Sequence, residues 1–490
     1  MLGIIFLLAA AGALISISLV GPIVIALIAN ETDVAARLTI HLTLGVFVSA
    51  ALLFAIAGRG RRIPQIGAFI MAALLWILLP IIAALPFSDV AGIGYLDGLF
   101  EVASGLTTTG ASALTNLGAV PKSVLFFRSQ LEWIGGYLTI LTMLVVLSPS
   151  GVGGMPLLAA SSLPGRNLSS SGGRTSDIAL LVARYYILTT MLCFLGLMLT
   201  GTRPFPAITL SMMAVSTGGF VPYEVSLDQL AGPFSLLILA AVLMVGATSI
   251  FWQRAILRGN LVALKLHRES YSIIIVAAIL ALAVSATLYR ISGSSGSEAF
   301  MSAVVEGVFT AASIVSTSGV ETREGVVAIL PIMLVLLVVF VGGSIHSTSG
   351  GVSHFRIGAM LIQCKREMHT LIYPSGVLGA RYGSQTYDVN QIKAVWSALG
   401  AALVLVTVAT FLLSFNGLDF DAALMAAVAA FSTAGPIYES GWAAHGAVGW
   451  PSYVDMNLGA KLTLILTMIL GRVEVLVVLG ALNLRYWLRS

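Results

Sequence analysis

Four short polar segments of one type lie within a chain that is 58% hydrophobic. Each fits the pattern (Ser/Thr)-Thr-x-Gly, and their final glycines are separated by 109, 100 and 116 residues. The backbone carbonyls of such segments can replace the water shell of a dehydrated cation, and glycine adopts backbone angles that let successive carbonyls face one axis. We therefore expect the four segments to form one cation site, whose candidate residues are Thr108, Thr109, Gly110, Thr217, Gly218, Gly219, Thr317, Ser318, Gly319, Thr433, Ala434 and Gly435.

The same residues have a simpler interpretation as packing motifs, because Gly, Ser and Thr are enriched at helix contacts in membranes. Packing motifs, however, recur at i and i+4 along a helix, whereas these segments are short breaks between apolar stretches. Two of them also match further upstream, since Gly98–Ser104 parallels Gly307–Ser313 in register with the final glycines. The recurrence favours the cation site.

The elements that must position these segments are apolar. Only 9% of the 490 residues are charged, against about 25% in a soluble protein, which indicates a polytopic membrane protein. Stretches long enough to cross about 30 Å of hydrocarbon predict ten spans, at 3–29, 40–58, 65–86, 124–148, 179–200, 232–254, 271–290, 326–345, 394–415 and 460–484. Four further apolar segments are too short or too interrupted to span and are expected to be re-entrant: 94–112, 204–221, 298–321 and 419–437.

Each re-entrant segment lies between two spans and ends in one of the polar segments. The predicted fold is therefore an all-α polytopic membrane protein with four span–re-entrant loop–span repeats around one pore, plus two N-terminal spans. The expected boundaries are 1–62 for the N-terminal pair and 63–165, 166–262, 263–380 and 381–490 for the four repeats.

The distribution of charge predicts the orientation. With both termini in the cytoplasm, most of the 25 Lys and Arg residues fall on the inner side, as the positive-inside rule requires. Most of the 21 carboxylates then fall outside, among them Glu31, Asp97, Glu101 and Glu224. Two interpretations stay open: an acidic vestibule that concentrates cations, or carboxylates that cross a membrane without penalty. In this topology all four re-entrant segments enter from outside.

Other residues bear on chemistry less directly. Arg128 and Glu132 stand at i and i+4 and are expected to form a structural pair. The two cysteines, Cys193 and Cys364, allow no disulfide framework, and the six histidines have no metal-ligand spacing. The chain contains neither a phosphate loop nor an HExxH motif. It is therefore not expected to be an enzyme.

The residues resemble the Trk/Ktr/HKT superfamily of potassium uptake proteins, most closely the bacterial Trk-type membrane subunit. Besides the four polar segments, the resemblance rests on Ser129–Tyr137, Gly151–Pro156 and Met468–Glu474, and on the extra N-terminal pair of spans. It implies transport of K⁺ across the bacterial inner (plasma) membrane, a homodimer embedded in membrane lipid, and a cytosolic nucleotide-binding gating ring of the RCK type; it implies no nucleic-acid partner.

The resemblance also implies roles for single residues. Arg472, in the middle of the last span, matches an arginine that acts as a barrier just below the filter; a cation there is costly unless it faces a cavity or a partner, and Glu474 at i+2 is a poor partner. Gly110 favours potassium, because serine at the first filter glycine accompanies sodium transport in some plant members.

A run rich in glycine and serine interrupts the third repeat and matches the intramembrane gate loop of the family, with candidate residues Gly342, Gly343, Ser347, Gly350 and Gly351. A plain cytoplasmic turn is the alternative. The run departs from the family, whose relatives often end it with Gly-Gly-Gly-Ile-Lys. The basic contact of the gate is therefore expected to be missing, or replaced by His346, His354 or Arg356.

Three function classes remain. The sequence favours potassium uptake, and its nearest alternative is a sodium or mixed monovalent cation transporter of the same architecture. A secondary transporter with inverted repeats is a different class, but here the four repeats share one orientation. The basic inner segments 254–268 and 356–381 suit a partner ring or anionic lipid, and positive-inside bias explains them nearly as well.

Overall fold

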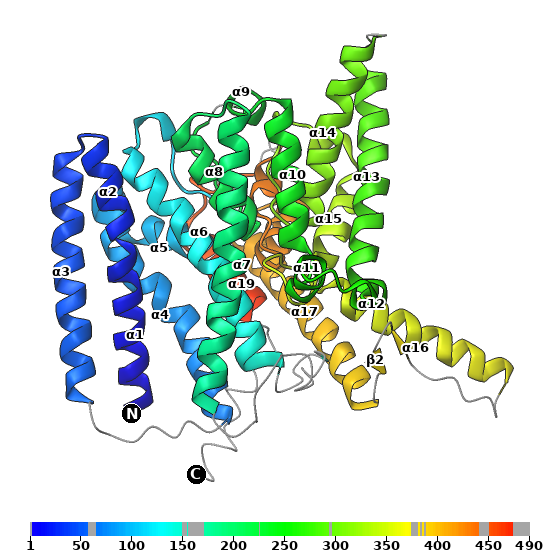
Figure 1. The fold of residues 1–490 in the computed structure, drawn as a ribbon, viewed down its shortest axis with the longest axis horizontal. Helices are drawn as coiled ribbons and strands as arrows, with labels where there is room; N and C mark the ends of the chain where they lie inside the picture. The colour runs from blue at the N-terminus through cyan, green and yellow to red at the C-terminus, as the bar shows by residue number, and fades with distance from the viewer. Residues whose placement is uncertain are drawn as a thin grey trace.

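Figure 1 shows the computed structural model as a bundle of helices that run mostly up and down. It describes residues 2–56, 65–148, 154, 171–224, 226–293, 296–373, 381–382, 385–386, 389–440 and 450–473. Some predictions lie outside these residues: Gly151–Pro156 apart from Gly154, the last span from Glu474 onward, and the repeat boundaries at 62, 165 and 380.

An N-terminal helical pair stands at one side of the bundle (Figure 1). It consists of α1 (Leu2–Ser18), which α2 (Val20–Ile28) continues, and α3 (Thr32–Ala55). α3 begins eight residues before the predicted span at 40, because an Asp33–Arg37 ion pair of 2.9 Å lets the helix extend beyond its apolar part. Small residues bring α1 and α3 close together, since a Cβ on Gly45 would lie 2.1 Å from the Ser16 hydroxyl.

Four repeats of helix, short helix and helix follow, as predicted. The first is α4 (Gln65–Ala91), α5 (Tyr95–Leu106) and α6 (Lys122–Thr142), and the second is α7 (Ser171–Leu199), α8 (Pro204–Ser216), α9 (Leu227–Leu230) and α10 (Pro233–Ala247). The third is α13 (Arg268–Ser292), α14 (Ser297–Val315) and α15 (Ile332–Val341), and the fourth is α17 (Val389–Phe415), α18 (Phe420–Phe431) and α19 (Leu458–Val473). Shorter turns are η1 (Leu117–Ala119), the π-helical η2 (Met143–Leu147), η6 (Val327–Ile329) and η7 (Gly435–Glu439).

Two predicted spans are broken. The stretch 232–254 is not one helix, because α10 bends by 113° into α11 (Ile250–Leu257). The bend lies at Thr248 and Ser249, and the Ser249 hydroxyl caps the new helix by accepting the Phe251 N–H at 3.3 Å. The only α-helix in the stretch 326–345 is the ten-residue α15. An irregular run then leads to α16 (His354–Ile372), which leaves the bundle at its lower edge (Figure 1).

Eight helices in the described part of the chain are long and apolar enough to cross a membrane, or nine if the bent pair counts as one span. One of them is α14, which the sequence analysis predicted to be too short or too interrupted to span. The helix is longer than expected because α14 pairs with α13 along a part that extends above the bundle (Figure 1), so it has 19 residues and passes the test for a span by length and composition. The chain still reverses direction after Val315.

The helices differ in burial according to their place. Only 11% of the spanning part of α3 is buried inside the protein, whereas 61% of α14 is buried. The short helices α5, α8, α14 and α18 therefore form the centre of the protein, and the long helices around them present apolar side chains outward. Two small elements complete the described chain: α12 (Leu261–Leu266), which leads into α13, and an antiparallel hairpin of β1 (Arg381–Tyr382) and β2 (Gln385–Thr386), which the all-helical prediction did not include.

Candidate ion-conduction site

The four central helices end in the same way. We call the segments that follow them the tetrapeptides: Thr107–Gly110, Ser216–Gly219, Ser316–Gly319 and Ser432–Gly435. The second residue of each has a left-handed backbone, with φ values of 57°, 51°, 61° and 55° at Thr108, Thr217, Thr317 and Thr433. Glycine usually occupies this position at a helix end, and threonine is rare there. The four-fold sequence pattern is thus also a four-fold pattern of backbone conformation.

Two backbone hydrogen bonds accompany each of these threonines. The Thr108 N–H donates to Gly105 O and the Thr109 N–H to Ser104 O, and the other three tetrapeptides repeat both bonds at the same offsets. Together they form the Schellman motif, which uses the N–H groups at a helix end and leaves the following carbonyls free. Among the described residues, the carbonyls of Thr108, Thr217, Thr317 and Thr433 accept no hydrogen bond, although all four residues are buried. Buried carbonyls without a donor are the oxygens that a dehydrated cation needs.

The tetrapeptides meet in a closed ring, in the order of the chain. A Cβ atom added at Gly110 would lie 2.3 Å from the Gly219 Cα, so the first tetrapeptide meets the second. The Ser318 hydroxyl donates to Gly218 O, which joins the third tetrapeptide to the second. A Cβ atom added at Gly319 would lie 3.4 Å from Ala434 O, which joins the third tetrapeptide to the fourth. The ring closes where the Gly435 N–H donates to Thr109 O at 2.7 Å. A side chain at any of the four glycines would collide with a neighbour.

Arg472 lies against the first tetrapeptide. Its side chain is only 3% exposed; Nε donates to Thr107 O at 2.6 Å, and Nη2 donates to the Thr108 hydroxyl. Nη1 also reaches the Ser349 carbonyl at 3.4 Å. The guanidinium therefore links the end of α5 to the irregular run after α15, and Arg472 itself is 365 positions from Thr107 in the sequence.

This irregular run, Gly342–Ser353, is called the Gly/Ser segment below. It lies against the other three tetrapeptides: the Thr348 hydroxyl bonds the Thr217 hydroxyl at 3.2 Å, and the Gly350 N–H donates to the Thr317 hydroxyl at 2.9 Å. A Cβ on Gly350 would lie 2.6 Å from the Thr433 hydroxyl. Arg472 and the Gly/Ser segment together thus contact all four left-handed threonines.

Neighbouring helices hold the Gly/Ser segment in this place. Glu269 of α13 accepts the Ile345 N–H at 2.9 Å, the Ser344 N–H donates to Ala247 O at 2.9 Å, and the Ile250 N–H donates to His346 O at 3.1 Å. Among the predicted gate residues, Gly342 and Gly351 have φ of 66° and 84°, which glycine adopts without strain. Ser347 bonds within the segment, to Ser344 O and to the Ser349 hydroxyl, and a Cβ on Gly343 would lie 2.0 Å from that hydroxyl.

The basic side chains expected to replace the family's gate lysine contact other groups than the tetrapeptides. His354 contacts Ser272 of α13 at 3.1 Å, His346 packs edge-on against Phe251, and Arg356 donates to Val352 O at 3.2 Å. The contact between a basic residue and the tetrapeptides comes instead from Arg472.

The predicted pairing of Arg128 with Glu132 was wrong. Arg128 forms an ion pair with Glu101 of α5 at 2.7 Å and lies over the Phe220 ring, whereas Glu132 accepts the N–H groups of Gly219 and Phe220 at 2.8 and 3.0 Å. The two side chains of α6 serve different tetrapeptides. Glu101 accepts the Ala113 N–H at 2.7 Å, so it supports the first tetrapeptide from behind and does not face an outer vestibule.

Sequence reasoning missed the supporting role of these carboxylates. A signal was present, because a carboxylate within an apolar span is costly and is rarely without a function. The spacing of the residues did not indicate which backbone N–H groups would donate hydrogen bonds to these carboxylates.

Comparisons with known proteins cover nearly the whole chain. A family model, TrkH, described as cation transport protein, matches residues 37–261 and 301–483. The Trk system potassium uptake protein TrkH of Escherichia coli (strain K12) is 29% identical over 425 residues, which cover 86% of this chain and 85% of that protein. The protein of the same name from Vibrio parahaemolyticus is 28% identical over 485 residues, 97% of each chain. The crystal structure of the potassium transporter TrkH from Vibrio parahaemolyticus matches with a TM-score of 0.85 at 25% identity, over 99% of each chain.

Proposed function

The chain belongs to the TrkH family of cation transport proteins, and we propose that it takes up K⁺ through the ring of its four tetrapeptides. The family consists of membrane ion transporters, so this multi-pass protein is a transporter and not an enzyme. The proposal concerns the transported ion, the residues that bind it and the way in which its passage is controlled.

One observation carries the proposal: four equivalent buried carbonyls, at Thr108, Thr217, Thr317 and Thr433, accept no hydrogen bond among the described residues. A buried carbonyl without a donor is unfavourable unless a cation occupies the site. In the proposed filter these carbonyls, with those of the third and fourth residues of each tetrapeptide, replace the water of K⁺. The names of the relatives, which are potassium uptake proteins, support K⁺ over Na⁺.

We propose that the Gly/Ser segment gates this filter and that Arg472 is the barrier beneath it. The contacts of Gly350, Thr348 and Arg472 with the filter threonines support both roles, since they reach the tetrapeptides where the helices end, at their first and second residues. In this arrangement an ion cannot leave the filter until the segment moves.

The remaining assignments follow from the charge distribution and the family resemblance. We propose that the protein lies in the bacterial inner membrane with both termini in the cytoplasm, that it is a homodimer, and that a cytosolic RCK-type nucleotide-binding ring controls it. The proposed repeats keep the boundaries 63–165, 166–262, 263–380 and 381–490. The basic segment 254–268 and the basic residues of α16 are on the side expected for such a ring.

The decisive experiment measures ⁸⁶Rb⁺ uptake by liposomes that contain the purified chain, with unlabelled K⁺ or Na⁺ as competitor. We expect unlabelled K⁺ to block ⁸⁶Rb⁺ uptake and Na⁺ to leave the uptake unchanged. The Gly110→Ser variant should lose this preference, because its Cβ would collide with Gly219 and a serine is strained at a φ of 76°. The matched control is Gly118→Ser in the outer loop, where a Cβ atom would lie 3.5 Å from its nearest neighbour, Asn116 Oδ1.

Equal competition by Na⁺ in the wild-type protein would instead establish the alternative, a sodium or mixed monovalent cation transporter. The assay is run both with the chain alone and with a cognate ring and nucleotide, so that a requirement for the proposed ring is detected. Loss of selectivity in both glycine variants would show that the outer loop in general, and not the filter, governs the preference.

A further inference from the structure

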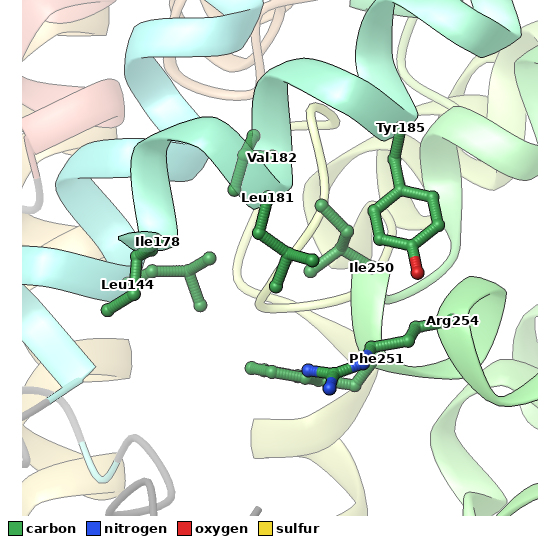
Figure 2. A pocket seen from close by; sticks show the side chains of 8 residues that line it. All are labelled: Leu144, Ile178, Leu181, Val182, Tyr185, Ile250, Phe251 and Arg254. Carbon is green, nitrogen blue, oxygen red and sulfur yellow. The ribbon is translucent and has the colours of Figure 1, made fainter. Parts of the chain in front are cut away.

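A narrow pocket opens beside the Gly/Ser segment, between η2, α7 and α11 (Figure 2). Its enclosed part measures only about 10 Å³, and the rest of the groove is open to the surroundings. Leu144, Ile178, Leu181 and Val182 form an apolar wall. Figure 2 shows the Tyr185 hydroxyl pointing toward the side of the pocket on which Arg254 lies. The pocket therefore combines an apolar wall with one cationic end, which is the pattern of an amphiphile site.

The cation at that end has no partner in the described protein. The Arg254 side chain is only 7% exposed, and its Nη1 atom is buried without a hydrogen-bond partner among the described residues. A buried guanidinium without an anion is strongly unfavourable, so the pocket calls for an anionic ligand.

The surroundings indicate the source of the anion. α11 and α12 lie at the level where α13 begins (Figure 1), and this stretch also carries Arg258, Lys265 and Arg268. This is the face that the charge distribution assigns to the cytoplasm, where anionic lipid headgroups gather. The side chains of Leu180 and Leu188, on α7, are exposed and apolar and place the neighbouring surface in hydrocarbon.

We propose that this pocket binds an anionic phospholipid of the cytoplasmic leaflet. Its phosphate bonds the guanidinium of Arg254 and the hydroxyl of Tyr185, and the first part of one acyl chain lies against Leu144, Ile178 and Leu181. The planar fork of arginine suits a phosphate by two parallel hydrogen bonds.

The same helix connects the pocket to the Gly/Ser segment. Ile250 and Phe251 line the pocket, and they contact His346 through the Ile250 N–H to His346 O bond of 3.1 Å and a ring contact of 5.2 Å between centroids. A ligand that binds the conformation with these contacts more tightly than other conformations increases the population of that conformation. The bound lipid therefore stabilises the Gly/Ser segment in its place beneath the tetrapeptides, and this regulatory part of the proposal rests on the proposed gate.

Binding is tested on the purified, delipidated full chain without any transport assay. Phosphatidylglycerol and phosphatidylcholine with identical acyl chains are titrated, and bound lipid is counted by native mass spectrometry while thermal unfolding is followed in parallel. We expect phosphatidylglycerol to be retained and to raise the unfolding temperature, and phosphatidylcholine to do neither. Arg254→Gln should weaken retention about tenfold, as expected for loss of a charged hydrogen bond.

Two further variants separate a site from general attraction. Leu181→Trp fills the pocket without changing charge and should also abolish retention, whereas Arg258→Gln, one helical turn beyond Arg254 and exposed, should leave it unchanged. Equal losses in Arg254→Gln and Arg258→Gln would overturn the proposal in favour of diffuse attraction to basic residues. Equal retention of both lipids, or retention of neither, would also overturn it; in the second case an acidic segment of a partner protein becomes the better occupant.

The regulatory part is tested by ⁸⁶Rb⁺ uptake in liposomes with and without phosphatidylglycerol. Wild-type uptake should fall severalfold when the anionic lipid is present, and Arg254→Gln uptake should not. An equal response in both proteins would overturn the coupling while leaving the binding result intact. Because binding is measured without flux, failure of the lipid site and failure of the proposed transport function are distinguishable.

Discussion

Threonine at a left-handed position is the most informative residue-scale feature. A β-branched residue in this conformation costs on the order of 1–3 kcal/mol, yet all four tetrapeptides contain one. Glycine would adopt this positive φ without strain, but it would also change to other backbone conformations easily. A threonine with two cap hydrogen bonds keeps its carbonyl in one direction. We infer that the strain is the cost of a rigid carbonyl ring. The hydroxyls of Thr108, Thr217 and Thr317 then serve a second purpose, as contacts for the proposed barrier and gate.

Arg472→Gln is expected to increase K⁺ flux severalfold. Two unit charges about 5 Å apart repel by about 3 kcal/mol at an effective dielectric constant of 20, so neutralising the buried guanidinium removes an obstacle beneath the filter. Uptake of ⁸⁶Rb⁺ per reconstituted protein checks this. Arg472→Lys retains the charge and should remain close to wild type; a folded Arg472→Gln protein with unchanged flux would contradict the barrier role.

Glu132 is expected to tolerate glutamine but not alanine. Its Oε1 atom accepts both the Gly219 and the Phe220 N–H groups, and a glutamine oxygen can accept the same two bonds. Alanine leaves two buried donors unsatisfied, which costs about 2–5 kcal/mol. Glu132→Ala should therefore lower the unfolding temperature and the K⁺ over Na⁺ preference together, and Glu132→Gln should preserve most of both. Equal effects of the two variants would show that the charge, not the acceptor, is what matters.

At the scale of elements, the Gly/Ser segment is a break in a span that serves as a contact surface. Its glycines let the backbone approach the tetrapeptides more closely than any side chain would permit, as at Gly350, where a Cβ would lie 2.2 Å from Ser432 O. Among the described residues, such a segment follows only the last helix of repeat three. The corresponding position of repeat two is occupied by the bend between α10 and α11, which bonds the segment through Ala247 and Ile250.

Gly350→Ala is expected to displace the segment and raise K⁺ flux. The added methyl group cannot fit against Ser432 O while the segment stays in place, so the seated arrangement loses population. Flux and thermal unfolding are measured together. Gly400→Ala in α17, where a Cβ meets nothing within 4 Å, is the matched control and should leave flux unchanged. Flux in Gly350→Ala at or below the wild-type level would contradict the gating role of the segment.

At the scale of the whole molecule, the charge distribution supports the proposed orientation. α16 leaves the bundle at the end where α1 begins (Figure 1), and it carries Arg356, Lys365 and Arg366. Lys and Arg retained on the cytoplasmic side set the direction of insertion. The proposed topology therefore places α16 in the cytoplasm and α9 outside.

The two native cysteines test this orientation. Cys364 in α16 is exposed and Cys193 in α7 is buried. A membrane-impermeant maleimide should label Cys364 in inside-out vesicles and leave whole cells unlabelled, with Cys193 silent in both. Gln229→Cys in α9 provides the opposite control, because it should be labelled from outside. Labelling of Cys364 in intact cells would reverse the proposed topology.

The sequence alone determined the class of the fold, the four repeats and the tetrapeptides at their centres. These features are local: a long apolar stretch predicts a membrane helix from its own composition, and Ser, Thr and Gly predict its end. The sequence also singled out Arg472 and the Gly/Ser segment. It did not determine the helix break at Thr248, because a short polar pair in an apolar stretch is equally compatible with a continuous span.

Only the tertiary structure decided which groups meet. Arg472 and Thr107 are 365 positions apart, and Glu132 reaches Gly219 from another repeat; such contacts depend on how helices pack, which the local pattern does not encode. The predicted pair of Arg128 and Glu132 was wrong for this reason, since spacing along one helix says nothing about stronger partners on its neighbours. The free carbonyls of the four threonines likewise emerge only when each helix end is capped and the four ends close into one ring.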